Sequence, residues 1–402
     1  MSEGTALVEA RGAAGEAADV VAFAGDAETL DTLRACLDGA GVVVRRGRVD
    51  DAARYLLSAA RAPRLLIVDV SGYETPLGEI DRLAEVCEPS VVVVVIGESE
   101  SVHLFRELLR AGVADYITKP VSPELLEPYV RERRSAIAAG PAKTRRGRLV
   151  AFAGARGGVG VTTLAVATAW RLSQVHKRRV ALVDLDLHGG GACVQLGVQP
   201  GGLLEALENH QRLDSLFLDR TLIAAAPRLS VLAEQIPLRR DAAPDPVAAQ
   251  AVLDLLARDF HYVVVDAPRG FGAACAQVFA NARSRVVVAD RTLPGLRDAA
   301  RLLEIEPAGP AATTIVINDH QPGLRQIVKT ATIAKALGAA PDIEIDYDRT
   351  AARRGDNMGE ALGEGRGPLA AAAERIADLI GNRRIGAGRP ARRLFGLIGG
   401  RT

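Results

Sequence analysis

Apolar and polar positions alternate along the chain in a regular rhythm from Asp19 onward. Short apolar runs, rich in β-branched residues, are each followed by a longer stretch with the period of an amphipathic helix. In the first part of the chain these runs span 20–25, 65–70 and 91–97. Buried strands that alternate with helices are typical of a parallel sheet covered by helices on both faces. The pattern therefore predicts a doubly wound α/β domain over 19–131.

A second series of the same kind follows a basic segment. Residues 132–147 carry four arginines and one lysine around a Gly-Pro pair, which indicates an exposed linker. Further apolar runs occur at 149–154, 180–186, 262–268, 285–290 and 313–319, and a helical pattern occurs at 368–381. They predict a second α/β domain with a doubly wound parallel sheet over 148–383. Residues 1–18 lack periodicity and are predicted to be disordered, whereas 384–402 form a basic tail.

The composition disfavours several classes of protein. Lys and Arg total 50 against 49 Asp and Glu, so the net charge gives no whole-molecule argument for nucleic acid binding. Aromatic residues are only 4%, which argues against a stacking platform for single-stranded nucleic acid. The four cysteines lie far apart without a CxxC pair, which disfavours a zinc site or a disulfide framework. Because neither an export signal nor a membrane-length apolar run is present, we expect a cytoplasmic protein.

The strongest chemical signal lies between the run at 149–154 and the helical pattern after it. A glycine-rich turn opens directly into a helix, so consecutive backbone N–H groups and the helix N-terminus can bind an anion. Thr162 stands just inside the predicted helix, where its hydroxyl can ligate Mg²⁺. A tight turn without a ligand is the alternative interpretation. The candidate phosphate-binding residues are Arg156, Gly157, Gly158, Val159, Gly160, Val161, Thr162 and Thr163.

This stretch resembles the deviant Walker motif, KGGxGK[ST][ST], of the ParA/MinD ATPase superfamily. In that family the first lysine reaches the partner's phosphates across a dimer, and the second contacts the β- and γ-phosphates. Arg156 replaces the first lysine and keeps a cation, whereas Val161 replaces the second and keeps none. A P-loop lysine neutralises charge that develops during phosphoryl transfer. The resemblance therefore implies binding of ATP and Mg²⁺ with weak or absent hydrolysis.

Three predicted strand ends extend the resemblance. Asp186 matches the switch I aspartate that orients the attacking water, and Asp266 matches the Walker B carboxylate that holds Mg²⁺ through water. Asn318 matches a strand-end asparagine that reads adenine, and 341–362 resemble the segment that packs over the base. Each carboxylate has an alternative interpretation, because an aspartate at a strand end often caps the following turn.

The first series of strands and helices resembles a CheY-like receiver. Asp69 matches the phospho-acceptor, and Lys119-Pro120 match the receiver's Lys-Pro pair. A receiver has an acidic pair for Mg²⁺ after its first strand, but only one carboxylate, Asp26, stands there. Gly97 ends the fourth strand and cannot bond a phosphoryl group as a Ser or Thr would. We therefore expect a partner-binding domain that does not require phosphorylation of Asp69.

An atypical receiver joined by a basic linker to a ParA/MinD-like domain resembles the CpaE/TadZ proteins of type IVb (Flp, tight adherence) pilus assembly. The resemblance implies a homodimer at the cell pole, peripheral to the inner membrane, that positions the pilus secretion machinery including its secretion ATPase. The basic tail contains a short apolar stretch, 394–398, that offers a peripheral membrane contact, with a frayed tail or a docking peptide as alternatives.

Two other functions stay open at this stage. One is a ParA-like partition or positioning ATPase that uses nonspecific DNA or membrane as its matrix, with the linker and the tail as phosphate contacts. The other is a response regulator with an ATPase output domain. Recognition of a specific nucleic acid sequence is not expected, because no helix-turn-helix pattern precedes the ATPase-like domain.

Overall fold

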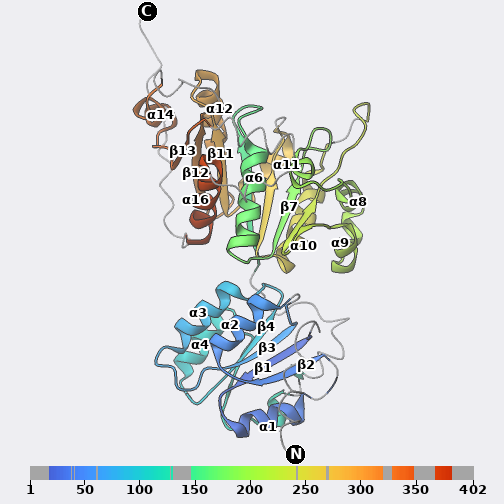
Figure 1. Cartoon of the computed structure of the whole chain (residues 1–402), viewed down its shortest axis with the longest axis vertical. Coiled ribbons are helices and arrows are strands. Elements are labelled where there is room, and N and C mark those ends of the chain that lie inside the picture. Colours follow the sequence, from blue (N-terminus) through green and yellow to red (C-terminus); the bar gives the residue numbers. More distant parts are fainter. Residues whose placement is uncertain are drawn as a thin grey trace, which may run out of the picture. The chain divides into compact units, whose positions relative to one another are not determined.

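The chain divides into two compact units, Met1–Arg146 and Gly147–Thr402, in a computed structural model (Figure 1). The structure describes residues 18–37, 39, 41–59, 62–126, 128–129, 146–240, 243–268, 271–319, 328–347 and 367–382, apart from the side chains at 85, 215, 216 and 219. The predicted disordered N-terminus, the linker, most of the segment over the base and the C-terminal tail lie almost entirely outside these residues. Among the helices of these ranges, none has the length and apolarity needed to cross a membrane.

The first unit is built on a five-stranded parallel sheet with the order β2-β1-β3-β4-β5. The strands are β1 (Val20–Ala24), β2 (Val42–Arg46), β3 (Leu65–Asp69), β4 (Val92–Gly97) and β5 (Asp115–Thr118). Helix α1 (Ala27–Cys36) packs on one face, and the other face carries α2 (Val49–Ser58), α3 (Pro76–Val86) and α4 (Val102–Arg110). In a sheet of this order, the residues after β1 and β3 meet at the edge where ligands bind in doubly wound folds.

The second unit has an eight-stranded sheet with the order β13-β12-β11-β6-β10-β7-β9-β8. All neighbouring strands are parallel except β8 and β9. Its strands are β6 (Arg148–Gly154), β7 (Val180–Asp184), β8 (Ile223–Ala226), β9 (Leu229–Leu232), β10 (Tyr262–Asp266), β11 (Ser284–Ala289), β12 (Ala312–Asn318) and β13 (Ile343–Ile345). The predicted fold class, two doubly wound α/β domains with parallel sheets, is confirmed.

Helices cover both faces of this larger sheet. One face packs against α6 (Val161–Trp170), the short α7 (Ala192–Leu196) and α16 (Pro368–Asn382). The opposite face packs against α8 (Leu203–Glu208), α9 (Ser215–Thr221), α10 (Pro246–Asp259), α11 (Ala273–Asn281), α12 (Leu293–Leu303) and α14 (Thr330–Leu337). Strand β6 lies inside the sheet between β10 and β11, so the turn that follows it opens at the middle of the carboxyl edge.

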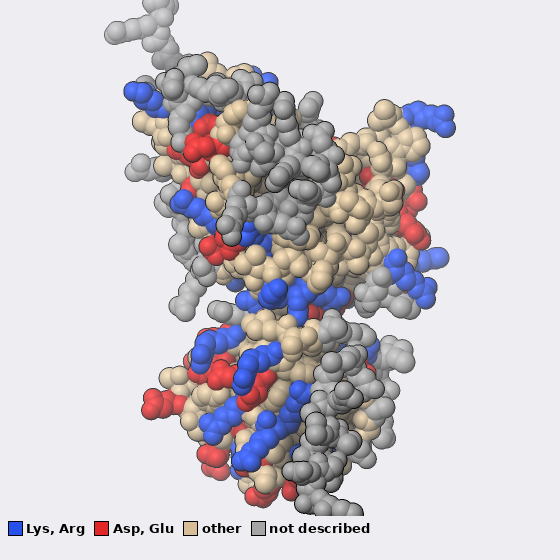
Figure 2. Space-filling view, viewed as in Figure 1, with Lys and Arg blue, Asp and Glu red and all other residues tan. Residues whose placement is uncertain are grey.

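The charged side chains are mixed in sign on the visible surface. Figure 2 shows both basic and acidic side chains on the face of the first unit that is turned to the viewer. This distribution agrees with the balanced composition of 50 basic and 49 acidic residues.

Candidate functional site

The glycine-rich turn joins β6 to α6, which begins directly after Gly160. Gly158 and Gly160 have φ angles of 78° and 88°, a conformation that side-chain-bearing residues rarely adopt. A Cβ atom at Gly158 would meet no atom within 4 Å, so the turn is open on that side. Val159 is only 1% exposed and anchors the turn in the core. Glycines with positive φ at a helix N-terminus form the concave backbone that binds anions.

Asn318, at the end of β12, is bound to this turn. Its Nδ2 donates a hydrogen bond to the carbonyl oxygen of Val159 at 2.8 Å. A Cβ atom at Gly160 would lie 2.8 Å from the same nitrogen, so the turn and the amide leave room only for glycine there. The adenine-reading role of Asn318 stays a prediction, and one of its amide hydrogens already binds the glycine-rich turn.

The two positions that carry lysine in the deviant Walker motif differ in their surroundings. Val161 packs directly on Gly154, where an added Cβ would overlap its methyl group, and it supplies no charge. Arg156 is 46% exposed, and its Nη1 donates to Oγ1 of Thr292 at 3.2 Å and lies 3.8 Å from Oδ2 of Asp290. The one cation at these two positions is therefore tied to the turn after β11.

Two buried carboxylates end neighbouring strands at the same edge. Asp184 of β7 and Asp266 of β10 are direct partners in the strand register, and they are 1% and 4% exposed. Burial and the charge of Asp184 raise the pKa of Asp266 well above its ordinary value, although a hydrogen bond with Thr162 lowers it. Burial likewise raises the pKa of Asp184 to about 6. Two buried carboxylates side by side supply the kind of oxygen ligand that Mg²⁺ prefers.

Asp266 also has an acceptor atom to spare. Its Oδ1 is buried and accepts no hydrogen bond from the residues that the structure describes. A buried acceptor without a partner is costly, and a Mg²⁺ ion or one of its waters would satisfy it. Since the hydroxyl of Thr162 already bonds the same carboxyl group, the residues present fit a nucleotide-bound Mg²⁺.

Asp186 and Thr163 both have protein partners. Oδ1 of Asp186 accepts hydrogen bonds from the backbone N–H groups of His188 at 3.1 Å and Gly189 at 2.8 Å. This carboxylate therefore caps the turn after β7, which was the alternative interpretation for it, and its water-orienting role stays a prediction. Thr163 accepts a hydrogen bond from Nε2 of Gln195, in α7, at 3.1 Å.

One residue beside the site has no sequence signal. Arg291 follows β11 and is fully buried; its Nε donates to Oδ1 of Asp319 at 2.6 Å, and its Nη1 donates to the carbonyl of Val328 at 2.9 Å. Its third nitrogen pairs with Glu344 of β13. These partners lie 28, 37 and 53 positions away, so no local motif could reveal them. The network fixes the residue that follows Asn318.

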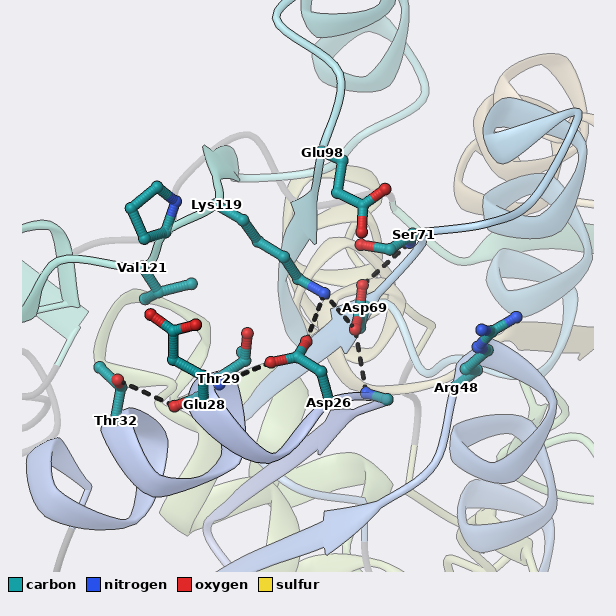
Figure 3. Close-up of a pocket in the computed structure, with 12 residues that line it drawn as sticks. Asp26, Glu28, Thr29, Thr32, Arg48, Asp69, Ser71, Glu98, Lys119 and Val121 are labelled. Atoms are coloured by element: carbon teal, nitrogen blue, oxygen red, sulfur yellow. Dashed lines mark hydrogen bonds and ion pairs between the residues drawn. The ribbon is translucent and has the colours of Figure 1, made fainter.

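A second candidate site lies at the carboxyl edge of the sheet in the first unit (Figure 3). Nζ of Lys119 donates to Oδ2 of Asp26 at 2.6 Å and to Oδ2 of Asp69 at 2.8 Å. Asp69 also accepts the backbone N–H groups of Gly25 and Ser71, each at 2.9 Å. The three receiver-like residues predicted from the sequence are thus one hydrogen-bonded cluster, and both oxygens of Asp69 accept hydrogen bonds.

The cluster holds its three groups in their charged forms. Burial raises the pKa of Asp26, but the hydrogen bonds from Lys119 and Thr29 outweigh it and lower the pKa to about 2. The pKa of Asp69 is also lowered, because hydrogen bonds from Lys119 and Ser71 exceed the effect of burial. Burial lowers the pKa of Lys119, yet its two carboxylate partners raise it overall. All three side chains are therefore ionised at neutral pH.

The cluster lines a pocket of about 650 Å³ together with Arg48 and Glu98 (Figure 3). Beside this pocket, Tyr116 packs against the end of β4. A Cβ atom at Gly97 would lie 2.5 Å from Oη of Tyr116, and this hydroxyl bonds the N–H and the carbonyl of Ser99 at 3.1 and 2.9 Å. The ring of Tyr116 thus takes the space that a longer side chain at position 97 would need.

Comparisons with known proteins agree with this geometry. No family model matches the chain. The septum site-determining protein MinD of Synechocystis sp. is 26% identical over 225 residues, which are 54% of this chain and 81% of that protein. The crystal structure of a ParA family ATPase from Chlorobium tepidum gives a TM-score of 0.53 at 21% identity, over 58% of this chain and 98% of the other. The second unit has the ParA/MinD fold.

Two further solved structures are similar to parts of the chain. MinD from Pyrococcus horikoshii, solved as a complex with Mg-ADP, gives a TM-score of 0.51 at 16% identity over 58% of this chain and 96% of the other. The pilus assembly protein CpaE from Caulobacter crescentus is 29% identical, with a TM-score of 0.27 over 30% of this chain and 93% of the other.

Proposed function

We propose that the protein is an ATP-binding localisation factor for type IVb pilus assembly. In this proposal it acts as a nucleotide-dependent homodimer at the cell pole, cytoplasmic and peripheral to the inner membrane. The observation that carries it is a receiver-like unit placed before a ParA/MinD-fold unit whose phosphate loop has Arg156 and Val161 in place of two lysines. The proposed partners are the pilus secretion machinery and its secretion ATPase.

The nucleotide part of the proposal rests on a distinction between binding and turnover. Backbone N–H groups of 157–163 do not depend on the side chain at position 161, so they can still bind phosphate. Thr162 and Asp266 remain to hold Mg²⁺, and a similar MinD structure contains Mg-ADP. Transition-state charge, however, needs a cation beside the β- and γ-phosphates. Arg156 would have to leave Thr292 to supply it, so we propose weak or absent hydrolysis.

The first unit has a partner-binding role in this proposal. Both oxygens of Asp69 are engaged by Lys119 and backbone N–H groups, which disfavours their use as a phosphoryl acceptor. Position 97 is a glycine, so it has no hydroxyl to bond a phosphoryl group, and Tyr116 fills the space that such a side chain would need. A folded unit with an intact internal ion cluster is suited to present a constant surface to a partner.

ATP binding and ATP turnover measured on the same sample test the nucleotide part. We expect Mg²⁺-dependent binding that is lost in Asp266→Ala, a shift from monomer to dimer with ATP in sedimentation, and turnover far below that of a lysine-bearing relative. Ordinary enzymatic turnover, or no binding at millimolar ATP, contradicts this part. Retention of the protein on nonspecific DNA at moderate salt would instead favour the partition-type alternative.

A deletion in the host tests the pilus part separately. We expect loss of Flp-type pili and polar foci of a fluorescent fusion in complemented cells. Normal piliation after deletion contradicts the pilus role without affecting the nucleotide measurements.

A further inference from the structure

A histidine that follows η1 (Arg171–Val175) and two carboxylates of α16 converge in the second unit, at the opposite end of α6 from the glycine-rich turn. Nε2 of His176 lies 3.0 Å from Oε1 of Glu374 and 3.9 Å from Oδ1 of Asp378. These three atoms all fall within 4.8 Å of one another. Because His176 and Glu374 are 198 positions apart, no spacing along the chain reveals the set.

The backbone fixes the position of the histidine. Helix α6 continues into a π-helical turn, η1 (Arg171–Val175), in which the N–H of His176 donates to the carbonyl of Arg171 at 3.0 Å. The next residue, Lys177, has a φ of 55°, which ends the helix. Single π-helical turns are rare, and those inside α-helices occur frequently at functional sites. The imidazole is therefore held toward α16 before any ligand binds.

The two carboxylates are also preorganised. Glu374 and Asp378 are four positions apart on α16, so they lie on the same face of that helix. Nη1 of Arg171 lies 3.7 Å from Oε2 of Glu374, which leaves Oε1 directed to His176. Contacts of this kind around a ligating carboxylate orient it toward a metal.

We propose that His176, Glu374 and Asp378 bind a first-row transition metal ion, with Zn²⁺ the best match. Zinc bonds imidazole nitrogen and carboxylate oxygen at about 2.0–2.2 Å, so its ligand atoms lie roughly 3–3.5 Å apart. The distances of 3.0 and 3.9 Å reach this range with a small side-chain rotation. Mg²⁺ and Ca²⁺ prefer all-oxygen sets, whereas imidazole favours zinc. Since the side chain of Asp378 is 55% exposed, water completes the coordination.

The proposed ion links two segments that matter for the nucleotide site. Helix α6 starts at the phosphate-binding turn and continues into η1, and α16 packs beside it in the same core cluster. A metal bound by His176 and by two residues of α16 would tie the last described helix to the far end of α6. We therefore expect the ion to stabilise this unit against unfolding, since a ligand that binds only the folded state does so by mass action.

Calorimetric titration of the untagged full-length protein with Zn²⁺ tests the site, with excess Mg²⁺ present to compete at the nucleotide site. We expect one ion bound with micromolar affinity and a rise in the thermal midpoint of the second unit. His176→Gln and Asp378→Asn should each weaken binding about tenfold or more. His210→Gln, which removes a histidine elsewhere in the same unit, should leave it unchanged.

Two of the variants keep the test decisive. Asp378→Asn preserves the hydrogen bond between His176 and Glu374, so its fold is retained even if His176→Gln unfolds. Cys36 is the one cysteine of the four that is not buried, so its thiol could bind zinc in competition with the proposed site. Cys36→Ser removes that thiol. Unchanged affinity in Asp378→Asn, loss of binding in Cys36→Ser, or no binding at submillimolar Zn²⁺ would each overturn the proposal.

Discussion

Replacement of Lys119 by Met should destabilise the first unit by an amount that the cluster geometry sets. The ammonium group bonds Asp69 at 2.8 Å, and the two side chains are 14% and 1% exposed. Removing one partner of a buried ion pair costs about 3–5 kcal/mol, because the other charge stays buried. Asp26 is 45% exposed, so its bond to Lys119 adds little. Since backbone N–H groups still support Asp69, we expect a loss of about 3 kcal/mol at neutral pH.

The Lys119→Met substitution should also reverse the pH dependence that Asp69 contributes to the stability of the first unit. In the unmodified protein the pKa of Asp69 is lowered from 3.8, so its stabilising effect is present above that value and is lost as the pH falls through the folded pKa. Burial gives the largest effect that raises the pKa of Asp69, and Lys119 gives the largest effect that lowers it, so we expect this pKa to rise when Lys119 is removed. The variant should then lose stability as the pH rises above about 4. The difference between the two proteins should therefore be small in acid and large at neutral pH.

Urea unfolding monitored separately in the two units provides the assay. The only tryptophan, Trp170, lies in α6, so its fluorescence reports the second unit. Hydrogen exchange of the β1 and β3 amides reports the first. Arg106→Met, an exposed cation on α4, is the matched control, and Lys119→Met combined with Asp69→Asn should recover most of the loss. A loss below about 1 kcal/mol, the range of a surface pair, or parallel pH profiles, would refute the reasoning.

Three further predictions concern the two candidate sites. Val161→Lys should tighten ATP binding by about one to two decades, measured by calorimetry against Val161→Leu, and equal affinities would show that position 161 does not reach the phosphates. Asp69→Asn should leave polar foci and pilus counts intact in microscopy, whereas loss of pili with a folded protein would indicate obligatory phosphorylation. Because burial raises the pKa of Asp184 from 3.8 to about 6, the Mg²⁺-free second unit should become less stable as the pH rises from about 4 to above 6, by on the order of 3 kcal/mol in total. Mg²⁺ should reduce this loss in denaturant titrations, and a flat profile without Mg²⁺ would contradict the effect of burial on the pKa of Asp184.

The central strands could be predicted from the sequence because they are buried on both faces. β1, β3, β7 and β10 are buried along their full length, and such strands require the continuous apolar runs that mark them in the sequence. The edge strands carry weaker signals. β2 contains two arginines and is partly exposed, and β13 is three residues long. Their existence depends on a neighbouring strand that offers hydrogen bonds, which no local pattern reports.

Each candidate site likewise has a part that the sequence predicts and a part that it does not. A turn that surrounds phosphate with consecutive N–H groups must be continuous in the chain, so residues 156–163 are readable as a motif. The partners of the charged groups cannot be recognised from a motif, because they lie far apart in the chain. Asp184 faces Asp266 because β7 and β10 are neighbours in register, and Lys119 reaches Asp69 because β5 and β3 end at the same edge. Which chemical groups are present follows from the amino-acid sequence. Their burial and their partners depend on how the strands and helices pack, and these set the pKa of each group and the ligand it can hold.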